Sequence, residues 1–256
     1  EKWLVERYRI NHITATSLID LDSQPPAELK VLAGAFTTGQ YRVTVGADRF
    51  EFNGLPYAGV EVATLADTLP DTTQLLDAAF NPQETKLKMS DRSILHFATH
   101  GAISIGTPEE SFILFGDGTP VNIAEVRNWN LNHVDLVVLS ACETGLGGNL
   151  GTGAEILGLG YQMQRAGARA AIASLWAVDD GGTQVLMNGF YHGLRGGMTK
   201  AEALRQAQIA LISGDYTAVG GERGNANTIE GLPHQATSRL SHPYYWAPFI
   251  LIGNGL

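Results

Sequence analysis

The sequence predicts an α/β fold in which a mostly parallel central sheet is flanked by helices. Two observations lead to this fold class. The runs at 94–101 and 135–145 are short, apolar and rich in β-branched residues, and each is stopped by glycine. Such runs are typical of strands that are buried on both faces of a parallel sheet. Segments with helical periodicity separate these runs along the chain, as the crossover connections of a parallel sheet require.

Strand and helix signals alternate through the first half of the chain. Val62, Leu65 and Leu69 recur at helical spacing, and Pro70 ends that helix. The segment 81–84 has a cap residue, then proline, then an acid at the third helical position, which marks a helix start. In chain order, the expected elements are a strand at 30–36, a hairpin of 41–45 and 49–52, the two helices, the strand at 94–101, a strand at 112–115 and a helix at 122–129.

The same alternation continues in the second half. A glycine-rich segment at 145–153 leads into a helix that carries Ile156 and Leu157. It lacks the Lys-Ser or Lys-Thr of a phosphate-binding loop, so we interpret it as a tight strand-to-helix connection. Thr199 and Glu202 have capping-box spacing at the start of a later helix. The remaining expected elements are a strand at 170–176, helices at 180–195 and 200–213, and a final strand at 246–252.

Composition and charge favour a globular enzyme and exclude other classes. Hydrophobic residues make up 44% of the 256 positions, which is enough for a sizeable core. The net charge of −9 argues against a nucleic-acid partner, because such proteins usually carry a basic patch. No apolar run approaches the ~18–20 residues of a membrane helix, so no membrane partner is expected. A single cysteine excludes an internal disulfide, and with no visible secretion signal it favours the cytoplasm.

The chain is expected to consist of an N-terminal arm or linker at 1–27 and one domain at 28–256. The arm ends in Gln24-Pro25-Pro26, a composition typical of linkers that lead from an upstream domain. Within the domain, residues 214–242 are rich in Gly, Asn, Ser and Thr and have little apolar periodicity. We therefore expect 214–242 to be a long flexible loop, and loops of this length are usually functional or disordered.

Reactive side chains come at the ends of the two apolar runs. His100 follows the first run and Cys142 follows the second. Ligands of open α/β sheets bind beyond the carboxyl ends of the strands, so both side chains are expected at one catalytic edge. A thiolate is a strong nucleophile and an imidazole transfers protons near neutral pH, so the pair predicts a Cys–His dyad. The competing interpretation is that Cys142 is an inert buried thiol.

The neighbouring histidine, His96, has a different expected role. It lies four residues before His100, a spacing that would suggest two metal ligands on a helix. On a strand, four residues span about 13 Å, which is too far for one ion. We therefore expect His96 to be structural.

His-Gly after one apolar strand and Ala-Cys after the next resemble the pattern of the caspase-like cysteine peptidases. The whole sequence resembles the CHAT family more closely, a group of caspase-like domains often found beside tetratricopeptide repeats. The resemblance covers residues 28–253. The matching stretches, in family order and spacing, are HFATHG (96–101), LVVLSACETGLG (136–147), GLGYQMQRAGARAAIASLWAVDD (158–180), TKAEALRQAQIAL (199–211) and YYWAPFILIG (244–253).

The resemblance implies a caspase-like sandwich and a hydrolase, a cysteine endopeptidase that cleaves a protein substrate through a thioester. Cys142 would be the nucleophile and His100 the acid and base, and the amides of Gly101 and Cys142 would form the oxyanion hole. No metal and no organic cofactor are implied. Beyond the substrate, the implied partner is a regulatory protein or an upstream repeat domain. The alternative is a catalytically silent caspase-like module that binds a regulatory protein.

An acidic pair, Asp179 and Asp180, follows the strand at 170–176 on the same carboxyl edge. Separase and gingipain use an acidic pocket residue to accept arginine or lysine, so the resemblance implies a substrate-binding role for one of these aspartates. The cleaved bond would then follow a basic residue. The competing interpretation is that the pair caps the following helix, since aspartate is among the best cap residues. The two roles do not exclude each other.

Overall fold

A six-stranded sheet forms the centre of the computed structural model, which describes residues 2–19, 22, 25–45, 48–103, 111–140, 143–144, 154–176, 178, 180–217 and 239–256. Five neighbouring strands are parallel, and β12 pairs antiparallel with β11 at one edge. From that edge, the strands are β12 (Phe249–Gly253), β11 (Ala170–Ser174), β9 (Leu136–Leu139), β5 (Ile94–Ala98), β1 (Val31–Ala35) and β4 (Thr72–Leu76).

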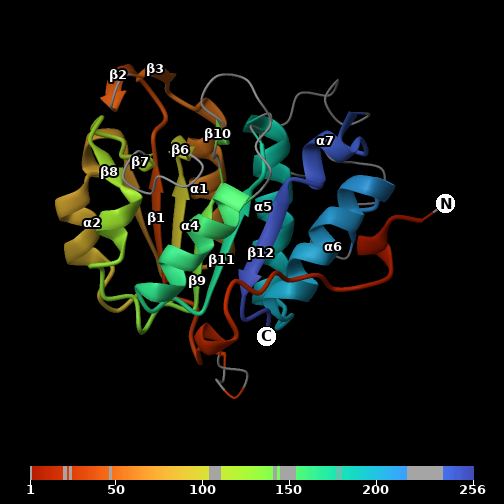
Figure 1. Ribbon diagram of the computed structural model, residues 1–256. Helices are drawn as coiled ribbons and strands as arrows, with labels where there is room; N and C mark the ends of the chain where they lie inside the picture. The colour runs from red at the N-terminus through yellow and green to blue at the C-terminus, as the bar shows by residue number, and fades with distance from the viewer. Residues whose placement is uncertain are drawn as a thin grey trace.

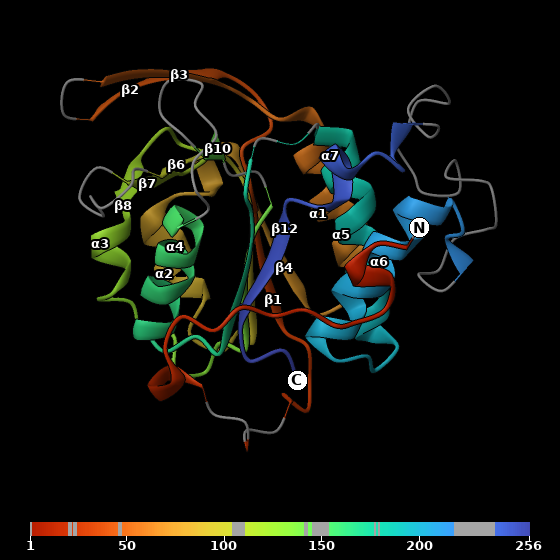
Figure 2. The same ribbon diagram turned by 45° about the vertical axis from the view of Figure 1, so that its right-hand side comes forward.

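Helices cover both faces of this sheet (Figures 1 and 2). One layer holds α1 (Pro56–Thr68), α5 (Asp180–Arg195) and α6 (Lys200–Ser213), and the other holds α2 (Pro82–Lys88), α3 (Ile123–Val126) and α4 (Ala154–Arg165). Alternate strand residues supply the two cores, since Ile94 and Ala98 pack toward α1 and α5 while Leu95 and Phe97 pack toward the other layer. The predicted α/β sandwich, with a mostly parallel sheet flanked by helices, is confirmed. No helix of the described residues combines the length and apolar character needed to span a membrane.

Two smaller sheets lie outside the central sheet, at the top and along the upper left side of Figure 1. A four-stranded sheet has the order β10-β6-β7-β8, and β2 pairs with β3 as the predicted hairpin. Phe36, Phe52 and Phe112 belong to a third apolar cluster, which joins the hairpin to the four-stranded sheet. These strands are β10 (Glu143–Thr144), β6 (Gly101–Ile103), β7 (Phe112–Leu114), β8 (Pro120–Asn122), β2 (Gln40–Val45) and β3 (Asp48–Asn53).

The N-terminal segment packs along the outer edge of β12, as the red chain in Figure 2 shows. His12 N donates to Leu251 O at 2.8 Å and His12 O accepts from Gly253 N at 2.8 Å, so His12 forms a parallel bridge to the edge strand. The Trp3 and Trp246 rings meet edge to face at 5.5 Å. Part of the segment expected as an arm is therefore docked on the domain. Its short 3-10 helices are η1 (Leu4–Glu6) and η2 (Thr16–Leu18).

Most helix boundaries follow the sequence signals, but the chain end differs from the prediction. Asn81 accepts from Glu84 N and Thr199 accepts from Glu202 N, so both predicted caps are confirmed. The expected strand at 246–252 is shifted, because α7 (Pro243–Trp246) begins at a proline and ends only at Trp246. Also, α3 stops before the predicted end, and the strand β4 has no counterpart among the predicted elements. Residues 218–238 of the expected loop lie outside the described residues.

Candidate active site

The strands β5 and β9 are parallel neighbours, with Phe97 opposite Leu139. The chain leaving each strand therefore reaches the same edge of the sheet, and Ser140 N donates to Phe97 O at 3.1 Å. Ala141 and Cys142 lie outside the described residues. The backbone of Glu143, just after them, pairs with Ala102. The chain on both sides of that undescribed pair thus lies beside the segment that contains His100.

One nitrogen of His100 is bound to a backbone carbonyl, because Nε2 lies 2.7 Å from Asn53 O. A carbonyl oxygen only accepts hydrogen bonds, so Nε2 carries the hydrogen in this arrangement. In the neutral ring Nδ1 then holds a lone pair, and it has no hydrogen bond to another described residue. Only 8% of His100 is exposed. The structure therefore presents a fixed imidazole with Nδ1 available for proton transfer.

Packing and backbone pairing fix the His100 ring and the glycine after it. The Phe52 ring lies 5.0 Å from the imidazole and the Phe36 ring 6.0 Å, measured between centroids. Leu114 N donates to His100 O at 2.9 Å, which makes Gly101 and Ile113 a non-hydrogen-bonded pair. The N–H of Gly101 consequently points away from β7, toward the side on which β10 pairs with β6.

The residues 53–57, which we call the support segment, connect β3 to α1 and carry the carbonyl that binds His100. Gly54 N donates to Gly39 O and Leu55 N donates to Phe36 O, each at 2.9 Å. A Cβ on Gly54 would lie 2.5 Å from Thr37 O. The support segment can therefore approach the chain after β1 this closely only with glycine at position 54.

The chain after β1 is itself held by Asp77, the first residue of the 3-10 helix η3 (Asp77–Ala79). Its carboxylate accepts from the amides and hydroxyls of both Thr37 and Thr38, at 2.7–3.2 Å. Partial burial acts to raise the pKa of Asp77, but these hydrogen bonds outweigh it and the pKa is lowered. Asp77 also has a φ of 48°, a left-handed conformation that aspartate tolerates better than most residues.

Asp180, predicted to bind a basic substrate residue or to cap the following helix, accepts a hydrogen bond from the helix α1. Its Oδ2 accepts from Tyr57 N, in the first turn of α1, at 2.8 Å. Leu55, the N-cap residue of α1, supplies no side-chain acceptor of its own. Asp180 is also the first residue of α5, so one carboxylate joins the beginnings of two helices. Asp179 lies outside the described residues.

His96 lies on the opposite side of β5 from Phe97 and has a structural environment, as predicted. Its Nε2 is 2.8 Å from Glu61 Oε1 and its Nδ1 is 2.8 Å from the Tyr191 hydroxyl. Each of these three residues is at most 1% exposed. Burial, and then the charge of Glu61, raise the pKa of Tyr191 well above its ordinary value. The network joins α1, β5 and α5 behind the candidate site.

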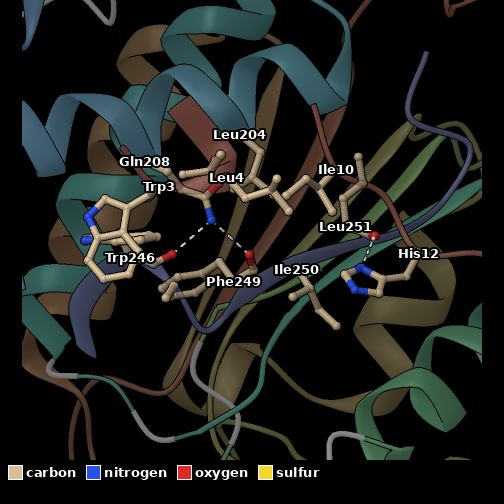
Figure 3. Close-up of a pocket in the computed structure, with 12 residues that line it drawn as sticks. Trp3, Leu4, Ile10, His12, Leu204, Gln208, Trp246, Phe249, Ile250 and Leu251 are labelled. Atoms are coloured by element: carbon tan, nitrogen blue, oxygen red, sulfur yellow. Dashed lines mark hydrogen bonds between the residues drawn. The ribbon is translucent and has the colours of Figure 1, made fainter. Parts of the chain in front are cut away.

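A separate apolar cavity of about 380 Å³ lies between the N-terminal segment, α6, α7 and β12. Figure 3 shows Trp3 and Trp246 at one end of it and His12 at the other. Gln208 Nε2 donates across it to the carbonyl oxygens of Trp246 and Phe249, at 2.9 and 3.1 Å. No residue of the support segment lines this cavity, so it is distinct from the site around His100.

Two site residues had no prediction from the sequence. Asn53 acts through its main-chain carbonyl, which every residue possesses, so its side chain carries no signal. Asp77 acts on Thr37 and Thr38 across 40 and 39 positions of the chain, respectively, and no local pattern marks such a contact. A usable signal was Gly54 between a strand and Pro56, because a glycine there indicates a close backbone approach.

Comparisons with known proteins give a family match and two similar folds. The sequence model of the CHAT domain matches residues 1–254. No curated protein matches the sequence. The structure is similar to the crystal structure of the Arg-specific cysteine proteinase gingipain R (RgpB), with a TM-score of 0.48 and 11% identity over 98% of this chain and 50% of that chain. It is also similar to the complex of the pro- and mature domains of RgpB from Porphyromonas gingivalis, with a TM-score of 0.47 and 11% identity over 98% of this chain and 51% of that one. The chain thus spans about half the length of these gingipain chains.

Proposed function

This chain belongs to the CHAT domain family, and from that premise we propose that it is a cysteine endopeptidase. In the proposal, Cys142 is the nucleophile, His100 is the acid and base, and the amides of Gly101 and Cys142 bind the oxyanion. The observation that carries the proposal is the fixed imidazole of His100, whose Nε2 binds Asn53 O and whose Nδ1 is available at the carboxyl edge of the sheet. Both nitrogens of the buried His96, by contrast, lie 2.8 Å from a side-chain oxygen of Glu61 or Tyr191.

The proposed reaction proceeds in two steps that conserve atoms and charge. The Cys142 thiolate attacks the peptide carbonyl, forming a C–S bond and an oxyanion that the two amides stabilise. The C–N bond then breaks, and protonated His100 gives its Nδ1 proton to the departing amine. In the second step Nδ1 takes a proton from water, the hydroxide attacks the thioester, and the C–S bond breaks. The products are a carboxylic acid, which loses its proton to solvent or to the released amine, and the starting enzyme with its Cys142 thiolate and protonated His100.

Substrate choice and partners extend the proposal. We assign the recognition of an arginine or lysine before the scissile bond to one of the two aspartates Asp179 and Asp180, because a carboxylate pairs bidentately with guanidinium. The substrate is a cytoplasmic protein in this scheme. An upstream repeat domain or a regulatory partner controls access to it.

A labelling experiment tests the proposal. A peptidyl chloromethyl ketone that ends in arginine should add one inhibitor mass to the chain, measured by intact mass spectrometry, and block peptide hydrolysis. Cys142→Ala should abolish labelling and hydrolysis, and His100→Ala should reduce hydrolysis by a factor on the order of 10²–10⁴. His192→Ala is the matched control, since His192 is an exposed histidine on α5. Absence of labelling, alone and with candidate partners, would favour the catalytically silent interaction module instead.

A further inference from the structure

We propose that Asp180 is a positioning residue for His100, acting through the support segment, and this role rests on the proposed function. The chain of contacts is short. Asp180 Oδ2 binds Tyr57 N at 2.8 Å, and four residues earlier Asn53 O binds His100 Nε2 at 2.7 Å. The carboxylate thereby fixes the start of α1, and the start of α1 fixes the carbonyl that selects the His100 tautomer.

The start of α1 depends on a side chain from outside the helix. The first amides of a helix have no partner within it, and a cap residue normally supplies one. Leu55 cannot do so, and Pro56 has no N–H, so the Tyr57 amide is the first that needs an acceptor. Asp180 provides that acceptor from α5. A carboxylate is also favourable there because it lies at the positive end of the helix dipole.

The support segment transmits this constraint because its backbone is bound at closely spaced points. Between the two ends, Gly54 N and Leu55 N donate to Gly39 O and Phe36 O, and the ring of Pro56 fixes its own φ. If the Tyr57 amide is released, the Asn53 carbonyl keeps the two middle hydrogen bonds and the pairing of Asn53 with Gln40 in the hairpin, but it loses the anchor on its helical side. That carbonyl must stay within hydrogen-bond reach of Nε2, or the neutral ring is free to exchange its tautomer.

The positioning role and the substrate-reading role of Asp180 predict opposite behaviour for one substitution. In Asp180→Asn the amide oxygen still accepts from Tyr57 N, so the support segment keeps its anchor. The negative charge that would read arginine or lysine is lost. In Asp180→Ala both the acceptor and the charge are lost. If Asp180 is a positioning residue, Asp180→Asn should therefore keep the His100 geometry and the turnover that Asp180→Ala loses.

The test compares the parent chain with Asp180→Ala, Asp180→Asn and Asn81→Ala. Asn81 caps α2 with a side-chain bond to Glu84 N at 2.9 Å, so Asn81→Ala removes a comparable cap at a helix remote from His100. Long-range ¹H–¹⁵N spectra of the full chain, recorded where the imidazole is neutral, report the tautomer of His100 directly. Hydrolysis of peptides that contain arginine gives kcat and KM separately.

We expect Asp180→Ala to move the two His100 nitrogen signals toward each other and to lower kcat by a factor on the order of 10–100, with little change in KM. Asp180→Asn should return the His100 signals to their parent positions, and Asn81→Ala should leave them there. Parent signals and parent kcat in Asp180→Ala would overturn the positioning role. Signals in Asp180→Asn that match those of Asp180→Ala would also overturn it. A chain that is inactive in every form, yet shows the expected signals, would refute the peptidase function and retain the link between Asp180 and His100.

Discussion

Tyr191 provides a sharp test of the buried network behind the site. Tyr191→Phe removes one oxygen, the atom that lies 2.8 Å from His96 Nδ1. Tyr191 is 1% exposed and His96 0% exposed, so water cannot replace the lost partner. An unsatisfied buried polar group costs about 1–3 kcal/mol. Loss of a hydroxyl leaves almost no cavity, so the cavity term adds little.

The expected loss of stability is measurable by calorimetry. A chain of this size loses about 2–4 °C in Tm for each kcal/mol, so Tyr191→Phe should lower the Tm by about 2–12 °C at neutral pH. The matched control is Tyr161→Phe, because Tyr161 lies on α4, is half-buried and has no hydrogen bond from its hydroxyl to a described residue. Equal Tm values for the two variants would refute the assignment of the Tyr191–His96 bond.

The pH dependence of the same variant gives a second check. Burial raises the pKa of Tyr191 well above its ordinary value of 10.0, so the folded state keeps this proton longer than the unfolded state. The stability that protonated Tyr191 contributes is therefore fully present below about pH 10. It falls as the pH rises further, because Tyr191 ionises first in the unfolded chain. Tyr191→Phe should lose this alkaline decline. If the urea midpoints of the parent and of Tyr191→Phe decrease equally as the pH rises above 10, ionisation of Tyr191 does not cause the decline.

Three further substitutions test the fold around the site. The pKa of Asp77 is lowered in the folded state, so its contribution to stability is fully present above about pH 3.8 and is lost as the pH falls through the lowered pKa. In Asp77→Asn the urea midpoint of unfolding should therefore decrease less steeply toward acid pH than in the parent. In Gly34→Ala the new Cβ would lie 2.3 Å from Phe80 Cδ2, so calorimetry should show a loss of about 1–3 kcal/mol that Phe80→Leu partly restores. Lys200→Met removes the ammonium that lies 2.9 and 3.0 Å from the oxygens of Asp135. Arg169 Nη1 still lies 3.7 Å from Asp135, so chemical denaturation should show a loss of at most about 3–5 kcal/mol. Adding Asp135→Asn to Lys200→Met should recover part of the lost free energy of unfolding. If nothing is recovered, the buried charge of Asp135 does not cause the loss.

The sequence predicted the parts of the fold that depend on local pattern. The buried strands β5 and β9 were evident from short apolar runs, and the caps at Asn81 and Thr199 from residue type and spacing. The adjacency of β5 and β9 also followed, because apolar runs that end in reactive residues indicate a common edge. The strand β4 (Thr72–Leu76) was not predicted, because only Leu75 of its five residues is buried and its sequence resembles that of a surface segment.

The contacts that hold His100 could not be predicted from the sequence, because they join residues that are far apart in the chain. The sequence suggested Asp180 as a cap of the following helix or as a substrate-binding residue, and no local pattern predicted its hydrogen bond with the Tyr57 amide, 123 positions away. Helix caps are recognised from neighbours in sequence, and this one is made across two packed helices. Asn53 supplies a main-chain atom, so only the three-dimensional arrangement reveals it. The assignment of Cys142 stays a prediction, since that residue lies outside the described residues.

The bridge between His12 and β12 has a consequence for the order of folding. His12 bonds to Leu251 across 239 positions, and Asn11 Nδ2 bonds to Gly253 O across 242. A ribosome makes the first segment early and the last strand late, so the first segment waits for its partner throughout synthesis. Until then β11 is an open edge strand, which can pair with other chains. Long-range closure of this kind is slow compared with formation of local contacts. We expect the Trp3–Trp246 contact to form in the slowest phase of refolding.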